Sequence, residues 1–356
     1  MGKRLNKKPY WLFGLVFLVI LGCFCLRLKK DRQLIKETGY KRLSFRQWEG
    51  EKEEWQKELR KKLAFLAGVD LTVSPAAALL WEGEAKEENG YFDKQLELLF
   101  SEDKKVSCRL LLPESAGQSE LPAVIFFPGH GEGIEELLAE KPGGGLSYQQ
   151  AAAQYLSQKG LITLTCEPWA FWSSSSWPGE KQTAINENLL KGKSILGIYI
   201  DQVRSQVNFL ESLEMVDPQR IGLAGVSFGG AVSFYTAALE EKIQAVFVSG
   251  FLTSYEETYF QHPHSLEMII PGIYQYGEIS DLAGLIAPRS VMFDNGETDN
   301  SLAMTAEKAE ALIENEVRPI FESFGAKEKV KLNKASRGHV LDREAADKFF
   351  REAFNE

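Results

Sequence analysis

The stretch Gly225–Gly230, which reads Gly-Val-Ser-Phe-Gly-Gly, constrains the fold of this chain more than any other feature of the sequence. It follows a short apolar run, Ile221–Ala224, and precedes a helical pattern rich in small residues at Ala231–Leu239. A serine on a sharp turn from a strand into a helix must adopt strained backbone angles, and glycines on either side of it remove the resulting clashes. The turn pushes the hydroxyl clear of the sheet, at a helix N-terminus whose dipole favours negative charge. Ser227 is therefore predicted to be a nucleophile; a glycine-rich turn with an incidental serine is the alternative.

Length, charge and cysteine content set broad limits. The 356 residues suffice for one large domain or two small ones, and the net charge of −9 leaves no electrostatic case for nucleic-acid binding. The four cysteines, at positions 23, 25, 108 and 166, lack the spacing of a metal site or a disulfide scaffold. Cys108 and Cys166 lie in strand-like runs, so we expect them to be small buried hydrophobes.

Residues 1–30 differ in kind from the rest of the chain. An uncharged apolar run of 17 residues, 10–26, is bounded on both sides by lysine and arginine. This length is short for a spanning helix and long for a signal-peptide core, and no small-x-small cleavage signal follows. We therefore expect an uncleaved N-terminal membrane anchor, with the main domain outside the cytoplasm. The flanking charges leave the orientation open, and the loose resemblance to a lipoprotein site leaves lipidation of Cys23 open.

A helical stripe of apolar residues follows at positions 45–66, with Trp55, Leu59 and Leu63 among its members. Such a stripe usually packs on its own domain, and a docking helix for a partner is the alternative. We therefore predict a helical extension packed on the core over residues 31–90. The main domain is placed at residues 91–356.

The periodicity of the main domain predicts an α/β fold. Alternation over residues 91–100 and 106–112 predicts an antiparallel hairpin. Continuous apolar runs, typical of strands buried on both faces, alternate with helical patterns. The runs are 123–127, 161–166, 221–224, 245–248 and 291–293, and the helical patterns are 147–159, 195–213, 228–239 and 302–324. We predict a mostly parallel central sheet with an antiparallel start and helices on both faces.

A serine nucleophile needs a base to activate it and an acid to orient that base. In folds with this turn, the acid and then the histidine follow the serine in the chain. Among the four histidines, His130 precedes Ser227, and His262 and His264 precede the plausible acids. His339, just after the strand-like residues 330–334, remains as the candidate base.

Three carboxylates lie in the turn after the apolar run 291–293, where the acid is expected: Asp294, Glu297 and Asp299. Asp294 directly continues the strand, so we expect backbone or loop contacts to hold it. Gly296 permits a turn that would bring Asp299 back towards the histidine. Asp299 is the preferred acid and Glu297 the next.

The oxyanion formed during acyl transfer needs preorganised hydrogen-bond donors. The backbone N–H of Phe228, directly after the serine, is one candidate. The loop Pro128–Gly133 supplies the second through His130 or Gly131, because its glycines let backbone amides approach a ligand. This loop lacks the Gly-Lys-Ser/Thr ending of a phosphate-binding loop.

Aromatic residues follow the run 161–166, among them Trp169 and Trp172. They are candidates for a substrate pocket that stacks a sugar or an aryl group, and a packed cap over the sheet is the alternative. His262 and His264 lie one residue apart, but no third ligand is evident, so no metal site is predicted.

Several of these motifs together resemble the α/β-hydrolase superfamily, and within it the dienelactone hydrolase and acetyl xylan esterase-like branch. They are Phe-Phe-Pro-Gly-His-Gly-Glu-Gly, the run from Val216 to Gly230, Ile-Ala-Pro-Arg-Ser-Val-Met-Phe and the late Gly-His. The resemblance covers roughly residues 45–356. It implies a triad of Ser227, Asp299 and His339, action on carboxylic esters and no cofactor. The chain departs from many relatives at Pro128, where they carry histidine.

The sequence thus predicts a membrane-anchored serine ester hydrolase that acts on a small-molecule or carbohydrate ester, including acetyl esters. A peptidase or amidase with the same machinery is one alternative. A catalytically silent binding module is the other, and the complete triad argues against it.

Overall fold

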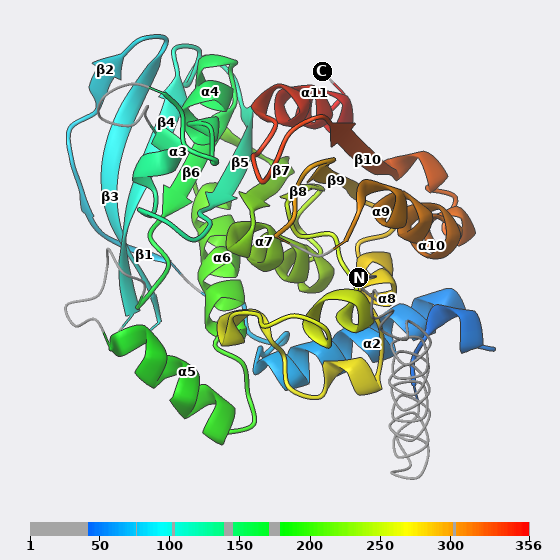
Figure 1. The fold of residues 1–356 in the computed structure, drawn as a ribbon. Coiled ribbons are helices and arrows are strands. Elements are labelled where there is room, and N and C mark those ends of the chain that lie inside the picture. The colour runs from blue at the N-terminus through cyan, green and yellow to red at the C-terminus, as the bar shows by residue number, and fades with distance from the viewer. Residues whose placement is uncertain are drawn as a thin grey trace, which may run out of the picture. The chain divides into compact units, whose positions relative to one another are not determined.

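The computed structural model describes residues 42–75, 77–101, 104–138, 145–170, 179–301 and 304–355. The chain divides into two compact units between Arg42 and Leu43, and the second unit, Leu43–Glu356, holds the sheet and its helices. Within the described residues, a ten-stranded sheet runs in the order β1-β3-β4-β6-β5-β7-β8-β9-β10, with β2 paired to β3 (Figure 1). Its strands are β1 (Ala78–Glu82), β2 (Lys86–Glu88), β3 (Tyr91–Ser101), β4 (Lys104–Pro113), β5 (Leu121–Phe127), β6 (Ile162–Cys166), β7 (Val216–Val226), β8 (Ala245–Ser249), β9 (Ser290–Gly296) and β10 (Val330–Ala335).

The helices separate the later strands. They are α2 (Lys52–Ala67), α3 (Glu135–Leu138), α4 (Ala152–Gln158), α5 (Glu180–Leu190), α6 (Leu196–Glu211), α7 (Phe228–Leu239), α8 (Ile279–Gly284), α9 (Ala306–Leu312), α10 (Arg318–Ser323) and α11 (Arg343–Ala353). Shorter 3₁₀ turns lie at Phe45–Gln47, Leu266–Met268, Ile273–Gln275 and Lys327–Lys329, and π-helical turns at Tyr255–Tyr259 and Ile313–Val317.

The direction of strand pairing changes once across the sheet. The pairs β1–β3, β3–β4 and β4–β6 are antiparallel, and every pair from β6 through β10 is parallel. This confirms the predicted α/β fold class, a mostly parallel sheet that starts with an antiparallel hairpin. Because the carboxyl ends of parallel strands lie at one edge, the loops after β5, β7, β8, β9 and β10 all open there.

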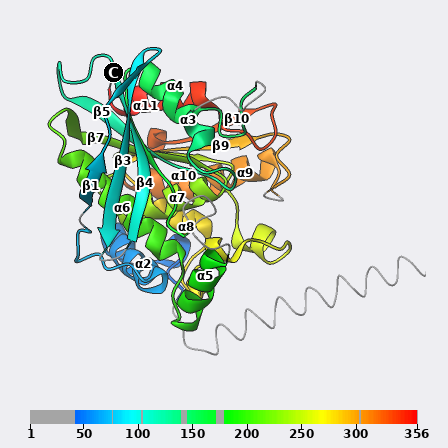
Figure 2. The same cartoon turned by 90° about the vertical axis from the view of Figure 1, so that its left-hand side faces the viewer.

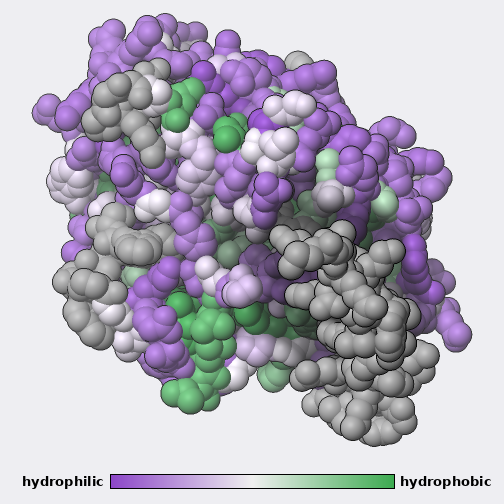
Figure 3. All heavy atoms as spheres, in the orientation of Figure 1, coloured by the Kyte–Doolittle hydropathy of each residue, from purple (hydrophilic) through white to green (hydrophobic). Residues whose placement is uncertain are grey.

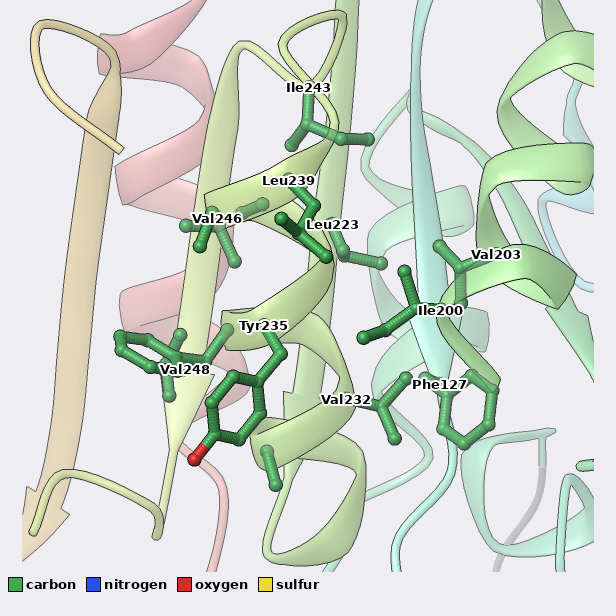
Figure 4. Close-up of a cluster of buried hydrophobic side chains, with 14 of the residues drawn as sticks. Phe127, Ile200, Val203, Leu223, Val232, Tyr235, Leu239, Ile243, Val246 and Val248 are labelled. Atoms are coloured by element: carbon green, nitrogen blue, oxygen red, sulfur yellow. The ribbon is translucent and has the colours of Figure 1, made fainter. Parts of the chain in front are cut away.

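Helices cover both faces of the sheet, as Figures 1 and 2 show for α4 and α11 on one face and α6 and α7 on the other. Side chains alternate along β5 accordingly: Ile125 and Phe127 enter the core on one face, and Val124 and Phe126 the core on the other. Figure 4 shows the first core, where residues of α6 and α7 pack against β5, β7 and β8. Strands buried on both faces explain the unbroken apolar runs.

Some elements differ from the sequence prediction. The helix expected from residue 45 begins at Lys52, after a short 3₁₀ turn. The single helix expected over 302–324 contains a π-helical turn before α10, where Pro319 supplies no N–H. The backbone oxygen of Asn315, to which an N–H at position 319 would donate in a regular helix, accepts a hydrogen bond from the side chain of Arg46 at 2.6 Å. β1, β2 and α5 were not predicted, because their residues are mostly exposed and carry little periodicity.

Cys108 and Cys166 are buried, but they are not separate small hydrophobes. They lie directly opposite each other on the antiparallel strands β4 and β6 and form a disulfide bond. The two cysteines are 58 positions apart in the chain, and the sequence gave no sign of this pairing, because only the register of the two strands brings them together.

The predicted membrane anchor and extracytoplasmic location must be corrected. In the part of the chain that the structure describes, no helix is long and apolar enough to cross a membrane. The longest there, α2 and α6, have 16 residues each, or about 24 Å, against a hydrocarbon core of about 30 Å. The apolar run 10–26 and Cys23 lie outside the described residues.

The surface seen in Figure 3 is mainly hydrophilic, with an apolar patch over α5. Leu190, the last residue of that helix, is 89% exposed. Scattered exposed apolar side chains are ordinary on protein surfaces and carry no function by themselves.

Helix α2 packs through Trp55, which is fully buried. The indole N–H donates to the backbone oxygen of Leu43 at 2.7 Å, and its ring meets that of Phe45 edge to face at 4.9 Å. Trp55→Ala should therefore lower the free energy of unfolding by about 3–5 kcal/mol, measured by urea denaturation. Phe65→Ala, on the same helix at a residue 77% exposed, is the control and should change it by less than about 0.5 kcal/mol. A loss below about 1 kcal/mol for Trp55→Ala would contradict this packing.

Candidate active site

Ser227 lies on the sharp turn between β7 and α7. Its backbone angles are φ 60° and ψ −121°, a conformation that residues with side chains rarely adopt. The Ser227 N–H donates to the backbone oxygen of Ser249 at the end of β8, at 2.9 Å. A Cβ on Gly229 would lie 2.1 Å from the backbone oxygen of Phe127, so only glycine lets the start of α7 lie against the end of β5. The turn is thus held by the two neighbouring strands.

Asp299 and His339 meet at the same edge of the sheet. Asp299 follows β9, His339 follows β10, and Nδ1 of His339 lies 2.7 Å from Oδ2 of Asp299. Ser301 bridges the pair, because its hydroxyl donates to Oδ1 of Asp299 at 2.5 Å and lies 2.8 Å from the same Nδ1. A carboxylate on this side favours a proton on Nδ1, which leaves Nε2 as an acceptor.

The imidazole lies close to the serine turn. A Cβ on Gly250 would be 2.7 Å from Cε1 of His339, so this glycine borders the ring directly. The residue before it, Ser249, accepts the hydrogen bond from the N–H of Ser227. The peptide Ser249–Gly250 therefore contacts the serine turn on one side and the imidazole of His339 on the other.

Asp299 is kept ionised by its partners. Burial by itself would raise the pKa of this carboxyl, but the hydrogen bonds from His339 and Ser301 outweigh it and hold the pKa below the usual value of 3.8. A carboxylate charged at neutral pH can orient an imidazole and stabilise its protonated form.

The other two candidate acids have different partners. Asp294 is 1% exposed, pairs with Arg337, and accepts hydrogen bonds from Ser249 at 2.7 Å and Asn333 at 2.8 Å. Burial raises its pKa, and these partners offset part of that effect. Glu297 accepts a hydrogen bond from the Ser336 hydroxyl at 2.6 Å. Of the three carboxylates, Asp299 is the one that contacts His339.

The loop after β5 lies beside the start of α7. The His130 ring packs against the Phe228 ring with 5.0 Å between centroids, and the Tyr148 hydroxyl donates to the backbone oxygen of His130 at 2.5 Å. The Gly129 N–H donates to Oε1 of the buried Gln149 at 2.9 Å. His130 and Gly131 are therefore held next to Phe228, the first residue of α7.

The predicted aromatic pocket is described only in part. Trp169 is half-buried against the core; its backbone N–H donates to Oε1 of Gln202 at 3.0 Å, and Lys104 lies over its indole ring at 5.1 Å. Trp172 lies outside the described residues. His264 packs on the ring of Tyr259 with 4.7 Å between centroids.

Sequence reasoning missed several residues around this site, among them Ser301, Tyr148, Gln149 and Glu267. Ser301 carried a weak signal, since a serine two residues after an aspartate often bonds back to that side chain. The others come from distant segments and carried none.

Comparisons with known proteins show which sequences and folds this chain resembles. A family model described as acetyl xylan esterase matches residues 182–262, a span that contains the serine turn. YtaP of Bacillus subtilis (strain 168), which has the provisional name of a hydrolase, is 26% identical over 290 residues. The match covers 79% of this chain and 93% of YtaP.

Solved structures share the fold at low sequence identity. A Bacteroides fragilis protein, provisionally named an acetyl xylan esterase, gives a TM-score of 0.65 at 18% identity and covers 84% of this chain and 82% of its own. A glucuronoyl esterase from Solibacter usitatus gives a TM-score of 0.62 at 15% identity, with 85% and 93% covered. The chain is thus similar in sequence to acetyl xylan esterases over residues 182–262 and to YtaP over most of its length, and it shares its fold with these solved structures.

Proposed function

We propose that this chain is a carboxylic ester hydrolase that acts through a triad of Ser227, His339 and Asp299. The observation that carries the proposal is the hydrogen bond between Nδ1 of His339 and Asp299, formed next to the strained turn that holds Ser227. Nε2 of His339 takes the proton of the serine hydroxyl as Oγ attacks the acyl carbonyl, and then gives it to the departing alcohol. Water, activated by the same nitrogen, releases the acid from the acyl-enzyme and restores the serine.

The negative charge of the tetrahedral intermediate needs donors that are already in place. The N–H of Phe228, directly after the serine, is proposed as the first donor, where the N-terminal end of α7 adds a favourable dipole. His130 or Gly131 is proposed to supply the second N–H. Support for this comes from the contact between the His130 and Phe228 rings, which keeps the two segments together.

Glu267 anchors the loop that carries His130. Its carboxylate, 4% exposed, lies 2.9 Å from Nε2 of His130 and accepts a hydrogen bond from Lys181 at 2.8 Å. Burial would raise the pKa of this carboxyl, but these two hydrogen bonds lower it to about 2. Three distant segments, the 128–133 loop, α5 and the turn at Leu266–Met268, are thereby tied together.

The proposed substrate is a carbohydrate or small-molecule ester, with an acetyl group as the first acyl group to test. The acetyl xylan esterase model and the solved esterases favour carbohydrate esters. Trp169, which follows β6 near the edge where ligands bind in such sheets, is proposed to line the alcohol side of the pocket. The proposed reaction needs no cofactor.

The first experiment replaces the nucleophile. Ser227→Ala should lower turnover of p-nitrophenyl acetate and acetylated xylan roughly 10⁴-fold or more, because no other group can form the acyl-enzyme. Labelling by a fluorophosphonate should be lost, while Ser212→Ala, at the end of α6, should keep both. A Ser227→Ala protein that is still labelled, with unchanged turnover, would overturn the assignment. A wild-type protein without labelling or ester turnover would favour the silent binding module, and hydrolysis of amides alone would favour the peptidase.

The second experiment distinguishes the acids. Asp299→Asn should lower kcat about 10³–10⁴-fold, because the amide no longer holds the imidazole with its proton on Nδ1. Glu297→Gln, which alters only the contact with Ser336, is the matched control and should stay within a few-fold of wild type. Turnover is measured per active site, titrated with the fluorophosphonate. If Glu297→Gln were the more damaging change, the acid would have to be reassigned.

The third experiment tests the Glu267 anchor through pH. Because the pKa of Glu267 is lower in the folded protein than the ordinary 4.5, its contribution to stability is complete above about pH 4.5 and is lost as the pH falls towards 2. Glu267→Gln should lower the free energy of unfolding at pH 7 by roughly 2 kcal/mol and flatten its decline over that range. Glu257→Gln, at an exposed pair with Lys308, should change it by less than about 1 kcal/mol. If the free energy of unfolding declined in parallel for wild type and Glu267→Gln as the pH fell, the role of Glu267 as an anchor would be contradicted.

A further inference from the structure

Tyr148 contacts both halves of the proposed site. Its hydroxyl donates to the backbone oxygen of His130 at 2.5 Å, and its ring stacks on the imidazole of His339, with 5.7 Å between centroids and 16° between planes. Its own backbone oxygen accepts a hydrogen bond from the N–H of Leu341, two residues after that histidine, at 2.9 Å. One residue therefore joins the loop after β5 to the loop after β10.

The turn at residues 147–151, which holds Tyr148, is built to fix this position. Next to Tyr148, the fully buried Gln149 accepts from the Gly129 N–H at 2.9 Å and donates to Glu136 at 2.7 Å. Gln150 and Ala151 follow with φ values of 60° and 46°, in the left-handed region that side chains disfavour. Consecutive residues persist in that region only where the surroundings impose it, and such positions cluster at functional sites.

The hydrogen bond from Tyr148 acts on the peptide that carries a candidate oxyanion donor. The carbonyl of His130 and the N–H of Gly131 belong to one planar peptide unit, so fixing the carbonyl also fixes the direction of that N–H. A hydrogen bond to the carbonyl also polarises the unit and makes its N–H a stronger donor. Burial raises the pKa of Tyr148, which keeps the phenol protonated and able to donate at neutral pH.

We infer that Tyr148 is a positioning residue of the proposed esterase site: its hydroxyl aims and polarises the His130–Gly131 peptide towards the oxyanion, while its ring holds the imidazole of His339. The inference rests on the proposed function and adds to it a residue outside the triad. It also selects Gly131 over His130 as the second oxyanion donor, because the bonded carbonyl shares its peptide with the Gly131 N–H.

The test compares the full chain with Tyr148→Phe, Tyr148→Leu and Tyr155→Phe. Tyr148→Phe keeps the ring and removes the hydrogen bond, so kcat for p-nitrophenyl acetate should fall about 10-fold with KM within about twofold, the signature of an interaction used in the transition state. Tyr148→Leu also removes the ring that stacks on His339, so its kcat should be about 10-fold lower than that of Tyr148→Phe. Tyr155→Phe, a tyrosine on α4 whose ring contacts Arg343 and Lys159, is the matched control and should match wild type.

Active-site titration and thermal unfolding separate positioning from folding. A positioning role predicts lower kcat per titrated site in both Tyr148 variants. A lower melting temperature with unchanged kcat per titrated site would overturn it, as would Tyr148→Phe turnover equal to that of Tyr155→Phe. Wild-type turnover and labelling of Ser227 test the proposed function separately, so normal wild-type activity with an unaffected Tyr148→Phe contradicts this inference alone.

Discussion

The left-handed backbone at Ser227 is the constraint on which the rest of the site depends. Holding a serine at φ 60° costs about 1–3 kcal/mol, so the surrounding structure must impose it. The neighbouring strands do so: β8 accepts the Ser227 N–H, and the end of β5 leaves room only for glycine at 229. All twelve residues of α7 are buried, so the helix that follows cannot move to relieve the strain. Because Ser227 is held at the carboxyl edge of the sheet, any base and acid that act on it must lie at the same edge.

A second carboxylate, Asp294, organises the histidine loop without contacting the histidine. It pairs with Arg337 and bonds Asn333 and the N–H of Asp342, and so it holds the segment from the end of β10 to the start of α11. A buried carboxylate is costly unless such partners surround it, and here they come from both sides of His339 in the chain. The two aspartates near the end of β9 therefore have different contacts. One shapes the loop, and the other contacts the imidazole.

The family match and the structure cover different parts of the site. The acetyl xylan esterase model spans residues 182–262 and thus includes the serine turn, whereas Asp299 and His339 lie beyond it. Those two residues come together through the parallel pairing of β9 and β10, which places the loops after both strands side by side. Backbone bonds from Glu297 and Thr298 to Ala335 and Arg337 then join the two loops. The shared fold therefore positions the strands, and contacts between this chain's own loops bring Asp299 and His339 together.

The sequence by itself determined the features that depend on local backbone preference and periodicity. The pattern Gly-x-Ser-x-Gly between a strand and a helix located the turn at Ser227. Unbroken apolar runs predicted the parallel sheet. Because the chain has only four histidines, elimination left His339 as the candidate base. Only the tertiary structure decided which carboxylate reaches that histidine, since Asp294, Glu297 and Asp299 lie close together in the sequence and differ in the partners that other segments bring. It alone paired Cys108 with Cys166 and brought Tyr148 and Glu267 to the loop after β5. Such contacts join segments far apart in the chain, and they depend on strand register and loop path, which local sequence does not encode.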